Sequence, residues 1–180
     1  MNRTIQIAPV RKTLLVEAPP ELAFEVFTAR LDRWWPKTHG IGAAPIRQSV
    51  IEPFVGGRWY TLCEDGKEVS VGHVLAWQAA ERFVVSWEIS ADWKPDARAA
   101  FASEVEVRFL ADGAGRTRVE LEHRNFERMG ATAGETMRKG VDGGWPGLLE
   151  LFAQEVSKVQ ELARGQKLAG DHTNKQGART

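Results

Sequence analysis

The clearest pattern of apolar and polar positions runs from Trp145 to Leu162. Apolar residues recur there at steps of three and four, which places them on one stripe of an α-helix; they are Trp145, Leu148, Leu149, Phe152, Val156, Val159 and Leu162. Asp142 would cap this helix, and Pro146 would lie in its first turn, where a missing N–H costs little. The pattern predicts a long helix with one face on an apolar core.

Most of the chain before this helix has the alternation of β-strands. It is clearest in residues 102–110, where Val105 and Val107 point one way and Glu104 and Glu106 the other. Such alternation is typical of an antiparallel sheet with one covered and one solvated face. The expected strands are residues 10–17, 46–52, 58–63, 69–77, 82–89, 102–110 and 117–125.

Two short helices are expected after the first strand, at residues 21–28 and 29–36. Residues 129–144 are rich in glycine and predict no more than a helical turn at 135–139 before the long helix. The element order therefore predicts an α+β fold: a curved antiparallel sheet of about seven strands wrapped around a long C-terminal helix. We expect one domain over residues 8–163. Residues 164–180 are polar and have little to bury, which predicts a disordered tail.

The composition narrows the classes of partner. Lys and Arg together number 24, as do Asp and Glu, so charge gives no reason to expect a nucleic acid or an anionic membrane as partner. No apolar run approaches the ~20 residues of a membrane span, and the N-terminus has no apolar core of a secretory signal. We therefore expect a cytoplasmic protein.

Metal and cofactor chemistry has no support in the sequence. Cys63 is the single cysteine, so neither an intrachain disulfide nor a cysteine-based metal cluster can form. The four histidines have no spacing typical of metal ligands. The glycine pairs resemble turns rather than phosphate-binding loops. We expect no metal site and no cofactor.

Three stretches together resemble a known family. They are Val10-Arg11-Lys12 with Pro19-Pro20-Glu21-Leu22-Ala23-Phe24; Gly56-Gly57-Arg58-Trp59 with Asp65-Gly66, Gly72-His73-Val74-Leu75 and Arg82-Phe83-Val84-Val85-Ser86-Trp87; and His123-Arg124-Asn125-Phe126 with Gly144-Trp145 and Leu148-Leu149. In this order and spacing they are similar to the helix-grip (SRPBCC) superfamily, which includes START domains, polyketide cyclases and the birch-pollen allergen. Within it the chain resembles the activators of the heat-shock protein 90 ATPase. The family commonly has a proline after its fourth strand, where this chain has Ala79-Ala80.

The resemblance implies a hollow between the sheet and the long helix that accepts an apolar small molecule. Alternation along the strands suggests which side chains line it, together with residues of the long helix and two tryptophans near the mouth. The expected pocket residues are Trp34, Trp35, Trp59, Thr61, Cys63, Val85, Trp87, Val107, His123, Trp145, Leu149 and Phe152. An apolar cavity with a few polar groups is typical of small-ligand sites.

His123 is the main candidate for chemistry, because it shares a strand face with Val119 and Leu121. It could orient a ligand or act as a general base, or it could be a buried histidine satisfied by a neighbouring tryptophan, the backbone or water. His73 is a weaker candidate, and Cys63 is interpreted as inert packing. The strand glutamates alternate outward, which argues against paired carboxylates at the site. We therefore assign no catalytic residue.

Three functions remain open at this point. The first is a non-catalytic protein that binds an apolar or aromatic small molecule. The second, implied by the family, is a co-chaperone-like protein that contacts a heat-shock ATPase. The third is an enzyme of the cyclase or dehydratase kind that uses His123 as a base. The expected oligomeric state is a monomer or a homodimer.

Overall fold

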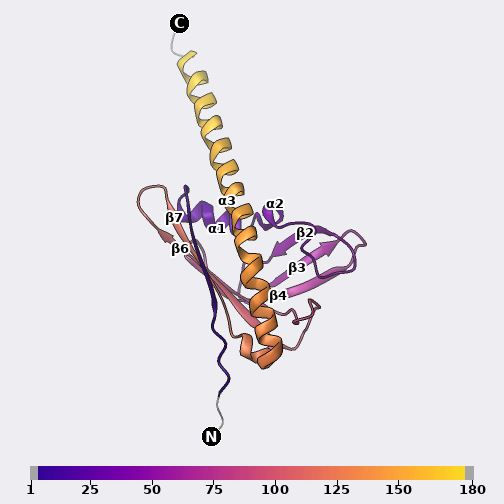
Figure 1. Cartoon of the computed structure of the whole chain (residues 1–180). Helices are drawn as coiled ribbons and strands as arrows, with labels where there is room; N and C mark the ends of the chain where they lie inside the picture. The colour runs from indigo at the N-terminus through magenta and orange to yellow at the C-terminus, as the bar shows by residue number, and fades with distance from the viewer. Residues whose placement is uncertain (1–3, 177–180) are drawn as a thin grey trace.

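A computed structural model describes residues 4–176 and shows one seven-stranded antiparallel sheet crossed by a long helix (Figure 1). The strand order is β1-β7-β6-β5-β4-β3-β2, so only β1 is placed out of sequence order, beside β7. The α+β helix-grip fold is confirmed, and each strand begins and ends within two residues of its expected limits. The strands are β1 (Val10–Val16), β2 (Ile46–Ile51), β3 (Arg58–Cys63), β4 (Glu68–Gln78), β5 (Arg82–Trp87), β6 (Ser103–Ala111) and β7 (Thr117–Arg124).

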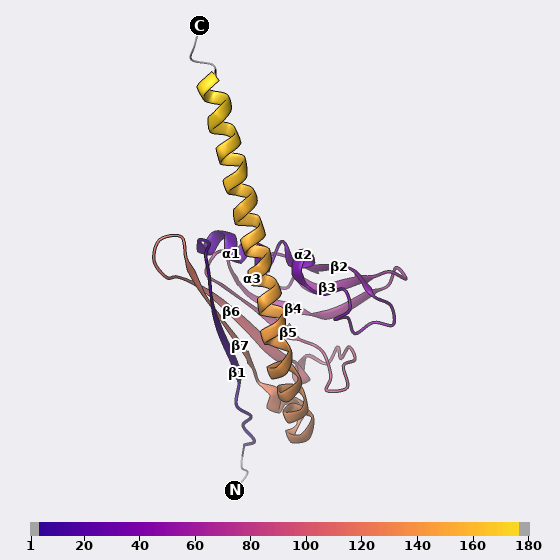
Figure 2. The same ribbon diagram turned by 45° about the horizontal axis from the view of Figure 1, so that its top comes forward.

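Two short helices, α1 (Pro20–Phe27) and α2 (Leu31–Trp34), follow β1 as expected. They lie against one end of the sheet, where α1 contacts both β6 and the long helix α3 (Figure 2). Two 3₁₀ turns that were not expected from the sequence flank the last hairpin: η1 (Ala99–Phe101) and η2 (Phe126–Met129). The α1 and α2 side chains fill that end of the hollow: the Phe27 ring lies 4.9 Å from Phe152 and 5.0 Å from Trp34.

The sheet is irregular around β4, where the register shifts against both neighbouring strands. Gly72 explains part of this geometry, because a Cβ there would lie 1.8 Å from the Ser86 carbonyl oxygen. Only glycine allows the two backbones to approach so closely. The adjacent His73 places Nδ1 2.7 Å from Glu88 Oε2.

The long helix starts earlier than we expected. α3 spans Ala131–Gln176, so Asp142 lies inside it and pairs with Lys12 at 2.7 Å instead of capping it, and Pro146 is an interior residue. The expected start was wrong because the glycines of this segment suggested a loop. Met137 and Val141 continue the apolar stripe of Trp145 and are buried on the core, and such packing outweighs low helix propensity.

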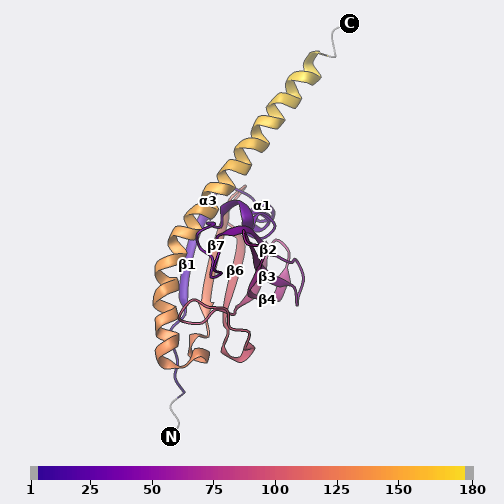
Figure 3. The same ribbon diagram turned by 90° about the vertical axis from the view of Figure 1, so that its right-hand side faces the viewer.

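The expected disordered tail is also not what the structure shows. α3 continues to Gln176, and residues 177–180 lie outside the described part. The side chains of residues 161–170 are exposed, and this part of the helix extends away from the sheet (Figure 3). The segment has little to bury, but it is rich in Leu, Ala, Arg, Gln and Lys, which favour helix. Low hydrophobicity therefore did not exclude helix here.

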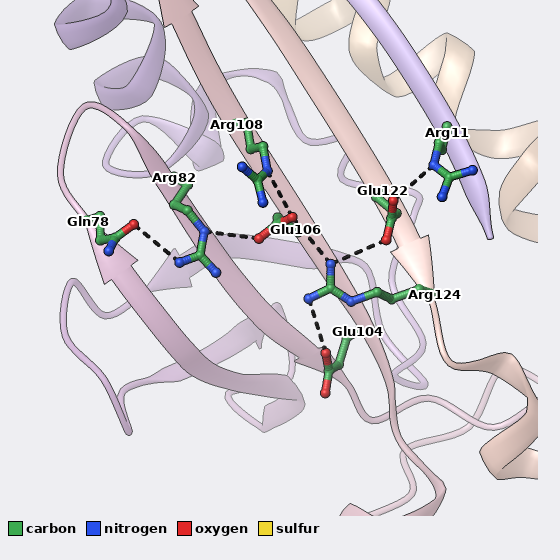
Figure 4. A network of polar contacts seen from close by, with 8 residues as sticks. All are labelled: Arg11, Gln78, Arg82, Glu104, Glu106, Arg108, Glu122 and Arg124. Carbon is green, nitrogen blue, oxygen red and sulfur yellow. Dashed lines mark hydrogen bonds and ion pairs between the residues drawn. The ribbon is translucent and has the colours of Figure 1, made fainter.

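The outer face of the sheet has a network of arginines and glutamates (Figure 4). Glu106 accepts hydrogen bonds from Arg82 and Arg108, each at 3.0 Å, and from Arg124 at 3.3 Å. Burial alone would raise the pKa of the Glu106 carboxyl, but the hydrogen bonds from Arg108 and Arg82 outweigh it and hold that pKa below its ordinary value. The glutamates of this network lie on the outer face of the sheet, away from the helix-covered side, as the alternation indicated.

Candidate ligand-binding site

A cavity of about 350 Å³ lies between the sheet and α3. Its size falls within the range of small-molecule sites. Its lining comes from the α2–β2 segment, from β3, β4 and β5, from the β5–β6 connection and from α3. The lining residues are Trp35, His39, Gly40, Ile41, Trp59, Thr61, Val71, Trp87, Ile89, Trp93, Gly140, Val141, Gly144, Trp145 and Leu148.

The mouth of the cavity is marked by those lining residues that are also exposed. They come from three segments that are far apart in sequence: His39 and Gly40 after α2, Trp93 between β5 and β6, and Gly140 and Gly144 on α3. The remaining lining residues are buried or half-buried. A ligand would therefore enter between the α2–β2 segment, the β5–β6 loop and the N-terminal half of α3.

Four tryptophans form a closed ring of aromatic contacts in the cavity wall. Ring centroids are 5.5 Å apart for Trp35–Trp59 and Trp59–Trp87, 6.1 Å for Trp87–Trp145 and 6.3 Å for Trp145–Trp35. Each contact is edge-to-face or tilted, which is a favourable geometry for aromatic pairs. All four were among the expected pocket residues. Together they give the cavity an aromatic surface from both the sheet and the helix.

Two lining residues carry buried polar atoms without a protein partner. Within the described residues, neither Thr61 Oγ1 nor Trp87 Nε1 has a hydrogen-bond partner, and the two residues are 3% and 5% exposed. A buried polar group left unpaired is costly. Two other indoles in the lining are paired: Trp145 donates to His123 at 3.2 Å, and Trp35 donates to the His39 carbonyl at 3.4 Å. The cavity wall therefore retains hydrogen-bonding capacity at Thr61 and Trp87.

Replacing Thr61 with valine is expected to raise the free energy of unfolding of the ligand-free protein by about 1 kcal/mol, because it removes a buried hydroxyl that has no partner. Urea denaturation measures this change. Ser49→Ala is the matched control, since Ser49 Oγ is also buried and unpaired but Ser49 does not line the cavity. A Thr61→Val variant less stable than wild type would show that the hydroxyl is satisfied after all.

His123 lies behind the cavity wall rather than on it. It is fully buried, with Nδ1 accepting from the Trp145 indole and Nε2 2.8 Å from Ser103 Oγ. Because an indole N–H can only donate, Nδ1 carries no proton, so Nε2–H donates to Ser103. Burial lowers the pKa of the imidazole from 6.5 to about 3. A neutral histidine with both nitrogens engaged and no place in the lining matches the alternative of a buried histidine satisfied by a neighbouring tryptophan.

The other expected pocket residues divide into two groups. Trp35, Trp59, Thr61, Trp87 and Trp145 line the cavity, whereas Trp34, Cys63, Val85, Val107, His123, Leu149 and Phe152 do not. The second group is buried in the core; Trp34, for example, donates its indole N–H to the Val26 carbonyl at 2.9 Å. The cavity takes up only part of the space between sheet and helix, because α1 and α2 fill the rest.

Ten lining residues were not predicted from the sequence. Val141 and Leu148 could have been found, since they lie on the helical stripe of Trp145 at spacings of four and three. Trp93 and the segment from His39 to Ile41 are in loops, where no periodicity indicates direction. The others missed are Val71, Ile89, Gly140 and Gly144.

The described residues contain no group of three or more His, Cys, Asp or Glu side chains arranged to hold a metal ion. Within the same part of the chain, no helix is both long and apolar enough to cross a membrane.

Comparison with known proteins places this geometry in a family. The family described as "Activator of Hsp90 ATPase homolog 1-like protein" matches residues 17–157. None of the curated protein sequences matches the chain. Among solved structures, the anthrahydroquino-γ-pyrone synthase Txn09 is 39% identical, with a TM-score of 0.59 and coverage of 83% of this chain and 97% of Txn09.

Two further structures show the same fold. CalC from Micromonospora echinospora, described as a self-sacrificing resistance protein, is 28% identical, with a TM-score of 0.60 and coverage of 83% and 94% of the two chains. MLL2253 from Mesorhizobium loti is 18% identical, with a TM-score of 0.62 and coverage of 84% and 98%. Since the family match spans most of its length, this helix-grip chain belongs to the family of activator of Hsp90 ATPase homolog 1-like proteins.

Proposed function

We propose that this protein binds a planar aromatic small molecule in the cavity between the sheet and α3. The observation that carries the proposal is the ring of four mutually contacting tryptophans in the wall of a cavity of about 350 Å³. Aromatic faces and edges favour other aromatic rings at centroid distances of 4.5–7 Å. The lining holds few polar groups, as is usual for sites that bury most of an apolar ligand.

The unpaired polar groups in the cavity wall indicate which polar atoms the ligand carries. The Trp87 N–H is a donor, and the Thr61 hydroxyl can donate or accept. A ligand with a carbonyl or hydroxyl on its ring system could pair with either group after a small adjustment of the side chain. Similarity to Txn09 supports the same class of ligand, because an anthrahydroquino-γ-pyrone is an oxygenated fused-ring system. We therefore infer an oxygenated, fused aromatic ligand.

The test begins with a native mass spectrum of the freshly purified protein beside its denatured mass. A bound molecule appears as extra mass that is lost on denaturation. Binding of 1,8-dihydroxyanthraquinone, a planar probe with ring oxygens, is then measured by calorimetry. We expect the wild-type protein to bind the probe, and no binding of this or a related fused-ring quinone would contradict the proposal.

Filling the cavity from α3 should weaken this binding strongly. Leu148 lines the cavity and is buried, so Leu148→Trp places an indole in the ligand's space and is expected to weaken probe binding at least tenfold, which corresponds to about 1.4 kcal/mol. Leu151→Trp is the matched control, because Leu151 is exposed on the same helix and lies outside the lining. Equal affinities in the two variants would place the ligand elsewhere.

A second candidate is a ring-forming enzyme that uses the same cavity, favoured by the 39% identity to a synthase. His39 at the mouth is the one ionisable side chain in the described lining, whereas His123 is not available. A change in the mass of the released ligand, seen in the same spectra, would distinguish turnover from binding. Contact with a heat-shock ATPase and the oligomeric state stay predictions.

A further inference from the structure

Trp93 is an unusual residue for its place in the chain. It lies in the loop between β5 and β6 with a left-handed backbone, at φ +60°. Such a conformation is disfavoured for a bulky side chain and persists only where the surroundings hold it. Here the loop is tied at its base: the Trp93 amide donates to the Ser90 carbonyl at 2.9 Å, the Ser90 amide donates to the Lys94 carbonyl at 2.8 Å, and Ile89 bridges Pro95.

The strained backbone places the Trp93 ring at the cavity mouth. Trp93 lines the cavity, yet 44% of the residue remains exposed. A tryptophan that served only as core filler would be buried, as the four tryptophans of the ring are. The exposed part of Trp93 is apolar surface that an incoming aromatic ligand could cover.

On the opposite side of the mouth, Gly140 of α3 leaves room for the Trp93 indole. A Cβ on Gly140 of α3 would lie 2.9 Å from Trp93 Cζ2, closer than side chains tolerate. Gly143, one turn further along the same helix, has nothing within 4 Å of such a Cβ. Glycine weakens a helix at either position, but only at Gly140 does its lack of a side chain make room for the indole.

We propose that Trp93, resting on Gly140, is the residue that sets which fused-ring ligands enter and stay in the cavity. This rests on the proposed function, and it adds a specificity determinant to it. The fixed loop holds the Trp93 backbone, so the indole forms one wall of the mouth, and the ligand packs against its inner surface. Ligands longer than the space behind the indole are excluded.

The test compares two probes of different length: the three-ring 1,8-dihydroxyanthraquinone and the four-ring 5,12-naphthacenequinone. Trp93→Asn removes the wall and keeps a residue that tolerates positive φ. We expect it to weaken three-ring binding about three- to tenfold, the worth of one aromatic contact. Because the wall is gone, the four-ring probe should lose less affinity than the three-ring probe, or gain affinity. The dissociation constant of the four-ring probe divided by that of the three-ring probe should therefore fall at least about threefold.

Gly140→Ala should act through the same contact. It displaces the indole, so it is expected to weaken three-ring binding to a similar extent, and the double variant with Trp93→Asn should show no further loss, as residues in contact are non-additive. Gly143→Ala is the matched control and should keep wild-type affinity. Thermal unfolding of each variant establishes that it is folded before binding is measured.

The outcomes separate the two proposals. If the wild-type protein binds neither probe, the proposed function fails, and the role of Trp93 fails with it. If the wild type binds but Trp93→Asn keeps both the affinity and the ratio, Trp93 is not a determinant and the proposed function stands. If the double variant loses affinity by the product of the two single-variant losses, Gly140 and Trp93 act independently, and their coupling through one contact is overturned.

Discussion

Replacing Phe152 with alanine is expected to lower the free energy of unfolding by about 3–5 kcal/mol, the usual cost of removing a buried aromatic ring. Phe152 is fully buried, and its ring centroid lies 4.9 Å from that of Phe27 and 5.6 Å from that of Trp34. The three rings join α3 to α1 and α2, so their packing cannot relax without moving a helix. Urea denaturation followed by circular dichroism measures the loss.

Leu151→Ala, at the neighbouring position, is the control. Leu151 is 36% exposed on the same helix, so its replacement is expected to change stability far less. Phe152 does not line the cavity, and the folded Phe152→Ala variant should therefore bind 1,8-dihydroxyanthraquinone as the wild type does. A stability loss below 1 kcal/mol, or a specific loss of binding, would mean that Phe152 faces the ligand rather than the core.

The second large effect is a loss of stability in mild acid. Burial lowers the pKa of His123 to about 3 in the folded protein, against 6.5 when it is exposed. Between these values the unfolded chain binds the proton and the folded protein does not, so stability falls as pH falls. From pH 7 to pH 5 we expect a loss of about 2 kcal/mol, since each pH unit below 6.5 costs about 1.4 kcal/mol.

Comparison with His123→Gln isolates this contribution. Glutamine has the same kinds of donor and acceptor as the neutral imidazole and does not titrate, so the variant should lack the loss between pH 7 and pH 5. The other three histidines are present in both chains, and their effects cancel in the difference. The carboxylates, which begin to gain protons near pH 5, are also common to both proteins and cancel in the same way. Equal slopes in the two proteins would show that His123 accepts a proton without unfolding.

The fold was largely predictable because its signals are local. Alternation within β6 and β7 depends only on which residues face the core, and the stripe from Trp145 to Val156 depends only on helical geometry. Turn residues set the ends of the strands. The prediction was wrong at the start of α3, where the glycines suggested a loop. Burial of Met137 and Val141 on the core stabilises the helix there.

Composition was also a poor guide to the C-terminal segment. Few apolar residues after residue 163 suggested disorder, yet the helix continues to Gln176. Backbone hydrogen bonds within a helix are local and do not require a buried face, so a segment that includes Arg, Gln, Lys, Leu and Ala can extend one even though it also holds two glycines.

The candidate site was predictable only in part. Alternation correctly placed Trp59, Thr61 and Trp87 on the covered face of the sheet, and all three line the cavity. The direction of a side chain is set within its own strand. Whether that side chain lines a cavity depends on how much of the interior the other elements fill. Val85 and Val107 also face inward and lie in the packed core.

The sequence by itself therefore determined the helix-grip architecture, the outward direction of the strand glutamates and the aromatic character of the interior. Only the tertiary structure decided where the interior stays open, that His123 is held between Trp145 and Ser103, and that Trp93 meets Gly140. The physical reason is that periodicity follows from backbone geometry within one element. Cavities, buried hydrogen bonds and close contacts depend on the packing of elements that are distant in sequence.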